Sequence, residues 1–105
     1  MYILNTSFMV DYDVHDHWLN TFRNRFLPFL QESGFKDLIF TKVISNEDEG
    51  HFTYSLQVTL LDLARYKEYT EEIMQEYAAT YFPVYGEKVL WFISLMKKMD
   101  YPKNE

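Results

Sequence analysis

Residues 36–60 read KDLIFTKVISNEDEGHFTYSLQVTL and predict a β-hairpin. In the second arm, residues 51–60, polar and apolar side chains alternate without a break. Successive side chains of a strand point to opposite faces, so one face should meet a core and the other a polar environment. The first arm, residues 36–45, is apolar on both faces, and the acidic segment NEDEG at 46–50 predicts the turn.

The segment before the hairpin predicts a strand followed by a helix. Residues 2–10 alternate in the same way, with Asn5 and Ser7 at the middle of one face and a mainly apolar opposite face. The acidic stretch at residues 11–13 then interrupts this pattern. A second central strand with a polar row is therefore expected beside the hairpin.

The first helix is expected to run from Asp13, a favourable N-cap, to about Glu32, because apolar residues repeat every three or four positions between them. Pro28 lies inside this segment and predicts a kink near residues 24–27, since proline lacks a backbone donor. Gly34 suits the left-handed position of a Schellman cap, and the phenylalanine after it can fold back on the helix.

The segment after the hairpin predicts a second helix and a last strand. Asp62 is expected to open the helix, and Phe82-Pro83 or Tyr85-Gly86 to end it. Residues 87–98 then predict a strand that is apolar in both of its alternate rows. The register of this strand is left open by the pattern, because either row could face the helices.

These elements give the order β-α-β-β-α-β, which is the ferredoxin-like split motif of the α+β class. In this fold a four-stranded antiparallel sheet has its first and third strands at the centre, and both helices cover one face. We expect residues 1–98 to form this single domain and residues 99–105 to form a polar C-terminal tail.

The sheet face that the helices leave open is expected to be polar at its centre and apolar at its margins. The edge strands supply the apolar rows, which a lone monomer would leave in water. Two such faces packed together would form a dimeric α+β barrel and hence a homodimer. The alternative is a monomer in which the tail or a loop covers the face. The central polar residues are Asn5, Ser7, Ser55, Gln57 and Thr59.

Composition excludes several classes of partner. The 105 residues carry a formal net charge of −6 and no cluster of basic residues, so neither a nucleic acid nor an anionic membrane surface is expected to bind. No signal peptide or membrane-spanning run is recognisable, and we expect a cytoplasmic protein. Aromatic residues make up 19% of the chain, which favours a thick core or an extensive interface.

Several residues and short motifs are considered together in their order along the chain: Asn5, Trp18, Pro28, the strand TYSLQ at 53–57, Tyr66 and YGEK at 85–88. In this order they resemble the Domain of Unknown Function 4286 family. The resemblance covers nearly the whole chain and implies a bacterial, cytosolic, dimeric α+β barrel with no assigned activity. Members often carry a histidine two positions before the helix proline, where this chain has Phe26.

The segment DYDVHDH at residues 11–17 is the nearest thing to a metal site. As an extended strand it would place two aspartates and two histidines on one side, a plausible set of metal ligands. As the start of a helix, His15 and His17 would not share a face. The aromatic spacing that follows favours the helix, so no metal is expected. His51, at the hairpin shoulder, is expected to be exposed to solvent.

The best candidates for a binding pocket lie on the open face of the sheet: Asn5, Ser7, Ser55 and Gln57, with Trp91 from the last strand. The alternative for the polar residues is hydrogen bonding across a dimer interface. The alternative for Trp91 is the core on the helix side.

Two functions fit this face. The first is a non-enzymatic homodimer that binds a small organic ligand or a protein partner, with no cofactor. The second is an oxygenase- or isomerase-like enzyme, cofactor-independent or assisted by haem or flavin, with its site between the sheets. An enzyme would need a titratable or redox-capable group aimed into this space, and only Lys42 and Lys97 are expected to be charges that could point there. We therefore favour binding.

Overall fold

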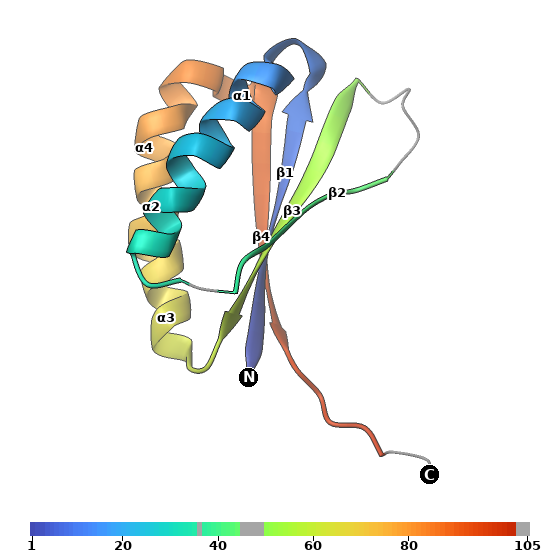
Figure 1. Cartoon of the computed structure of the whole chain (residues 1–105), viewed down its shortest axis with the longest axis vertical. Coiled ribbons are helices and arrows are strands. Elements are labelled where there is room, and N and C mark those ends of the chain that lie inside the picture. Colours follow the sequence, from blue (N-terminus) through green and yellow to red (C-terminus); the bar gives the residue numbers. More distant parts are fainter. Residues whose placement is uncertain (36, 45–49, 103–105) are drawn as a thin grey trace.

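The computed structural model describes residues 1–35, 37–44 and 50–102. Four antiparallel strands form one sheet in the order β2-β3-β1-β4, and two helical segments cover one of its faces (Figure 1). The predicted ferredoxin-like α+β fold, with the first and third strands at the centre, is confirmed. The strands are β1 Tyr2–Asp11, β2 Ile39–Lys42, β3 His51–Leu60 and β4 Val89–Lys97.

The first helical segment follows β1 and changes its winding along its length. Asp11, and not Asp13 as expected, caps it, because the Asp11 carboxylate accepts a hydrogen bond from the Asp13 backbone N–H. Pro28 does not break the helix, which widens into a π turn directly before it. The segment comprises η1 Tyr12–Val14, α1 His15–Thr21, the π turn η2 Phe22–Phe26 and α2 Leu27–Glu32.

The predicted Schellman cap ends this segment. Gly34 has a φ of 92°, and the N–H of Phe35 donates to the carbonyl of Leu30 at 3.2 Å. The N–H of Gly34 donates to the carbonyl of Gln31 at 3.0 Å, which completes the motif. Phe35 and Leu30 are both buried, so the cap also adds an apolar residue to the core.

The second helical segment follows β3 and also contains a π turn. Its N-cap is Asp62, as predicted, whose carboxylate accepts from two backbone N–H groups at 2.9 and 3.2 Å. Of the two possible ends, the helix passes through Pro83 and stops at Tyr85-Gly86. The segment comprises α3 Leu63–Glu68, the π turn η4 Tyr69–Ile73, α4 Met74–Tyr85 and η5 Gly86–Lys88.

The core between the sheet and the helices is built largely of aromatic rings. The ring of Phe8, on β1, lies 5.4 Å from Trp18, 5.0 Å from Phe22 and 5.6 Å from Tyr77, measured between centroids. The indole N–H of Trp18 donates to the Tyr77 hydroxyl at 3.0 Å. Burying this much ring surface explains the high aromatic content of the chain.

The first arm of the hairpin is shorter than predicted. Only four residues, Ile39–Lys42, form β2, and Ile44 is 91% exposed although its apolar side chain suggested a buried row. Gly50 has a φ of 79°, in keeping with the end of a turn. The rest of the predicted acidic turn, at 46–49, lies outside the described residues.

The register of β4 settles which of its rows faces the helices. Val89 is buried, and Trp91 packs edge-on against Tyr77 with a ring separation of 5.2 Å. In the antiparallel register Trp91 lies opposite Phe8, which belongs to the helix side. Trp91 therefore belongs to the helix-side core, which removes it from the candidates on the open face.

Candidate functional site

The candidate site is the sheet face turned away from the helices, called here the open face. Its centre is set by the pairing of the two middle strands, in which Asn5 lies opposite Gln57 and Ser7 opposite Ser55. On the other side of β1, Asn5 lies opposite Ser94. The predicted polar centre is thus confirmed, and these side chains lie next to one another on the sheet.

A short hydrogen-bonded chain orients the central side chains. The Ser55 hydroxyl donates to the Asn5 carbonyl oxygen, and the Asn5 amide N–H donates to the Ser7 hydroxyl at 3.0 Å. Gln57 makes no side-chain hydrogen bond to any described residue and is half-buried. An amide held in this position has free donor and acceptor groups to offer to a ligand or to a second copy of the chain.

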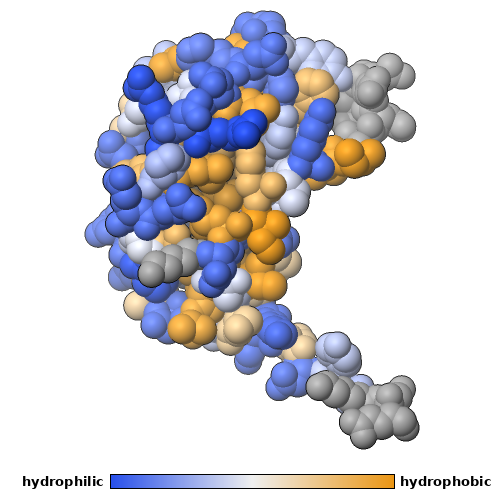
Figure 2. Space-filling model, viewed as in Figure 1, coloured by the Kyte–Doolittle hydropathy of each residue, from blue (hydrophilic) through white to orange (hydrophobic). Residues whose placement is uncertain are grey.

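Apolar side chains frame this polar centre on both edges of the sheet. Their exposed fractions, between 41% and 57%, are high for side chains of this size. In Figure 2 the surface is hollowed on the side away from the helices, and hydrophobic residues lie along the hollow. The margin residues are Ile39 and Val43 beside β3, and Leu90, Phe92 and Met96 beside β1.

The sequence-based set omitted Ser94 and Phe92, which the register of β4 places on the open face. A signal for them was present. Ser94 is the only polar residue between Val89 and Met96, and its row could have been matched to the polar centre of β1. Matching polar rows across neighbouring strands would have favoured this side of the sheet for both residues, without fixing the register.

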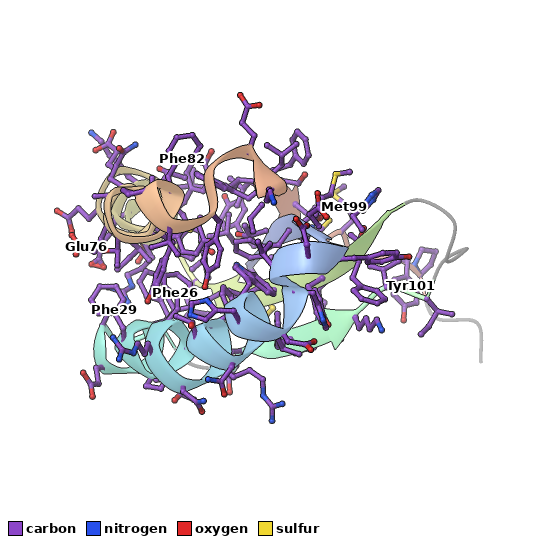
Figure 3. The ribbon with its side chains drawn as sticks, turned by 90° about the horizontal axis from the view of Figure 1, so that it is seen from above. Phe26, Phe29, Glu76, Phe82, Met99 and Tyr101 are labelled. Atoms are coloured by element: carbon purple, nitrogen blue, oxygen red, sulfur yellow. The ribbon has the colours of Figure 1, made fainter. Side chains whose placement is uncertain are left out.

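The C-terminal tail does not cover the open face over its described length. It runs away from the sheet below β4 (Figure 1), and Met99 and Tyr101 are 71% and 78% exposed. In Figure 3 both side chains lie on the side away from the helices. The alternative in which the tail closes the face of a monomer is thus not what the structure shows for residues 99–102.

The two lysines expected to be able to point into the space between sheets lie on the other face. Lys42 is opposite Tyr54, and its ammonium lies 4.0 Å from the ring centre of Phe52. Lys97 is opposite Tyr2, again in a helix-side row. That expectation was wrong because both residues were assigned without the strand register. On the described part of β1 and β3, the titratable groups of the open face lie at one end, where Asp11 is opposite His51.

The histidines of residues 11–17 serve structural contacts. A ring nitrogen of His15 hydrogen-bonds the Tyr54 hydroxyl, and Nδ1 of His17 lies 2.8 Å from the Tyr85 hydroxyl. The segment is helical, so the two rings point to different partners, and the residues that the structure describes contain no cluster of metal-ligating groups. Hydrogen bonds with Asp11 and Lys88 lower the pKa of Asp13 to about 2.

Three comparisons place this geometry among known proteins. A family model described as a domain of unknown function (DUF4286) matches residues 1–99. No curated protein matches the sequence. Among the described residues, no helix is both long enough and apolar enough to span a bilayer.

The fold is similar to those of several solved structures. A protein of the ethyl tert-butyl ether d (EthD) family from Bacillus halodurans has a TM-score of 0.66 at 9% identity, over 94% of this chain and 100% of the other. A dimeric ferredoxin-like protein from an uncultured marine organism has a TM-score of 0.59 at 14% identity, over 98% and 100%. A putative PII-like signaling protein from Thermus thermophilus has a TM-score of 0.52 at 16% identity, over 91% and 87%. At these identities the likeness shows the fold alone.

Proposed function

The chain belongs to the DUF4286 family, a domain of unknown function, and from this premise we propose that it acts as a homodimer that binds a small organic ligand between two open faces. The observation that carries the proposal is the open face itself, with a hydrogen-bonded polar centre inside an exposed apolar frame. The resemblance to the family supports a bacterial, cytoplasmic protein.

The apolar frame supports association with a second copy. Contiguous exposed apolar surface usually marks an interface, and two-fold pairing is the commonest way to cover it in a soluble protein. Phe92, 57% exposed at the sheet edge, is the largest side chain of the frame. One structural neighbour is itself a dimeric ferredoxin-like protein, which adds support to pairing in this fold.

The polar centre supports a ligand in the space that the dimer would enclose. Binding sites combine an apolar wall with a few convergent polar groups, and Gln57 and Asn5 supply amides of this kind. On β1 and β3, the titratable side chains of the open face are Asp11 and His51, which lie at one end of it, away from this centre. A binding role therefore fits better than acid–base catalysis.

Light scattering coupled to size-exclusion chromatography tests the dimer. At about ten micromolar we expect twice the chain mass of 12.8 kDa. Phe92→Asp should yield a monomer, because a carboxylate on the frame would be buried at the interface without a partner. The matched control is Phe82→Asp, since Phe82 is 48% exposed on α4, on the helix side (Figure 3). A wild-type monomer, or equal behaviour of the two variants, would refute the dimer.

Native mass spectrometry of freshly purified protein tests the ligand. We expect a dimer that carries additional small-molecule mass, which the Phe92→Asp monomer loses. A structure of the dimer with the space between the sheets filled by side chains would contradict ligand binding. Binding of a protein partner to the surface of the dimer would then be the remaining function.

A further inference from the structure

A second concave site lies between the two helical segments, on the opposite side of the molecule from the open face. This site, called here the helix groove, has a volume of about 400 Å³. Residues from α1 and η2 form one wall, and residues from α4 form the other. A dimer joined through the open faces would leave it accessible. The residues used below are His17, Asn20, Asn24, Arg25, Tyr81 and Tyr85.

Hydrogen bonds hold the polar side chains of the groove in place. His17 Nδ1 and the Tyr85 hydroxyl are 2.8 Å apart, which joins the two walls at one end. The Asn24 amide donates to the Asn20 carbonyl oxygen at 2.8 Å, which orients both amides. The His17, Asn20 and Asn24 side chains each keep one further polar atom for a ligand. The groove is therefore organised before any ligand arrives.

Arg25 is the cation of the groove and has no ion pair with any described residue. None of the residues that line the groove is acidic, although the chain as a whole carries a net charge of −6. Burial raises the pKa of the Tyr81 hydroxyl, and the neighbouring Arg25 charge opposes that shift. The Arg25 guanidinium thus lies near Tyr81, and the lining of the groove contains no carboxylate that could pair with it.

The π turn η2 is what places Arg25 there. Its two aromatic residues, Phe22 and Phe26, are each 2% exposed in the core, whereas Asn24 and Arg25 are exposed on the groove side. π turns are rare within α-helices and occur frequently at functional sites. The π turn therefore buries Phe22 and Phe26 on its core side and presents the side chains of Asn24 and Arg25 to the groove.

The groove adjoins a smaller hollow of about 220 Å³, which shares Thr80 and Tyr81 with it. This hollow is lined by aromatic side chains, among them Phe29, which is 37% exposed. Glu76 lines the same hollow and accepts a hydrogen bond from the Thr80 hydroxyl at 3.4 Å. In Figure 3 Phe29 and Glu76 lie together beside the helical segments, on the side away from the sheet.

We propose that the helix groove binds a small aromatic monocarboxylate. Arg25 pairs with the carboxylate, since a guanidinium offers parallel donors that match its two oxygens. The aromatic body lies along Tyr81 toward Phe29, where ring surfaces replace water. Glu76 at the far end repels a second carboxylate, which restricts the ligand to a single negative charge.

NMR titration of the ¹⁵N-labelled full chain tests this assignment. The probe is phenylacetate, and the controls are its neutral isostere phenylacetamide and inorganic phosphate. We expect saturable shifts confined to residues 17–29 and 76–85, with phenylacetamide and phosphate at least tenfold weaker. Shifts that do not saturate, or that gather on the open face, would refute the site. Phosphate binding as tight as phenylacetate would refute the aromatic carboxylate.

Two arginines on the same π turn provide a matched pair of variants. Arg25→Gln should weaken phenylacetate binding at least tenfold, and Arg25→Lys should weaken it less, because charge is kept and the paired donors are lost. Arg23→Gln makes the same change of charge outside the groove and should alter affinity less than twofold. Equal affinity of the Arg25→Gln and wild-type proteins would overturn the proposal. Phe92→Asp should bind normally, which separates this site from the dimer.

Discussion

The two faces of the sheet are made from the same four strands and yet differ in every physical respect. On the helix side, Leu4, Phe8, Leu56 and Val58 from the central strands are 0–1% exposed and lie under aromatic rings. On the open side, the central strands carry hydroxyls and amides, and apolar residues stand at the edges. The face with the apolar centre is covered by the helices of its own chain, whereas the face with the polar centre is left uncovered by the described residues.

Polar groups are treated differently on the two faces as well. Thr6 is the buried polar residue of the helix side, and its hydroxyl shares a hydrogen bond of 2.7 Å with Tyr69. Over the described residues, no buried side-chain nitrogen or oxygen lacks a partner. On the open face Gln57 keeps its amide free of described partners. Polar groups in the core are paired because an unpaired buried polar group is costly. Polar groups on the open face can remain unpaired within the chain, because water or another molecule can bind them.

The largest contrast should come from removing one ring on each face. Phe8→Ala should lower the free energy of unfolding by about 3–5 kcal/mol, because it empties a site packed on three sides by rings. Phe92→Ala should cost less than about 1 kcal/mol in dilute protein, with a loss that grows as concentration rises, since association stabilises the fold. Urea unfolding at several protein concentrations measures both. Equal losses at all concentrations would remove the distinction between the faces.

A smaller contrast should separate the polar residues of the two faces. In the Phe92→Asp background, Thr6→Val should cost about 1–3 kcal/mol, because it leaves the buried Tyr69 hydroxyl without its partner. Ser55→Ala in the same background should cost about 0.5 kcal/mol or less, since water can replace the lost hydrogen bond. Urea unfolding gives both values, and adding Tyr69→Phe to Thr6→Val should recover part of the loss. A Ser55 cost as large as that of Thr6 would contradict the comparison.

Alkaline pH should act on the helix side alone, because the described rows of the open face contain no tyrosine. Burial raises the pKa of Tyr69 to about 12, and burial also raises the pKa of Tyr77. A raised pKa means that stability is fully present below pH 10 and is lost as pH rises toward 12. Tyr69 alone should remove roughly 1 kcal/mol between pH 9 and pH 11.

Urea midpoints at these two pH values measure the loss. The control is Tyr101→Phe, since Tyr101 is 78% exposed and its replacement should leave the pH dependence unchanged. A midpoint that stays constant up to pH 11 would mean that the buried hydroxyls do not resist ionisation.

The smallest effect should come from the tail. A chain that ends at Lys98 should unfold within about 0.5 kcal/mol of the full chain and keep the same mass in light scattering, because Met99 and Tyr101 are exposed. A loss above 1 kcal/mol, or a change in oligomeric state, would show that the tail helps to cover the open face.

Local sequence patterns predicted an element correctly where all residues of one face had the same character, either polar or apolar. The alternation in residues 51–60 predicted the extent of β3 and the polar row of Ser55 and Gln57, and Asp62 and Gly34 marked helix boundaries correctly. Each of these signals depends on the local backbone geometry of a few neighbouring residues, which the sequence alone specifies. The first hairpin arm failed because an apolar run of residues does not say how far pairing continues, and Ile44 ended outside the core.

The π turns explain the misses in the helices. In the second helix, apolar residues repeat at intervals of three and four from Leu63, which predicts a buried stripe that includes Leu63 and omits Tyr69. In the structure Leu63 is 51% exposed and Tyr69 is fully buried. A π turn adds one residue to a turn and rotates the positions on either side of it relative to each other. Arg25 was missed for the same reason, because nothing in the local spacing showed which side of the widened turn would face α4.

By itself, the sequence determined the order of strands and helices, the main caps and the polar centre of the open face, because period and capping are properties of neighbouring residues. Only the tertiary structure decided that Trp91 joins the core while Phe92 frames the open face, and that two helices enclose a groove around Arg25. Apart from Ser94, both rows of β4 between Val89 and Met96 are apolar, so burial energy differs little between them. The choice follows from how β4 pairs with β1 and how the helices close over the sheet.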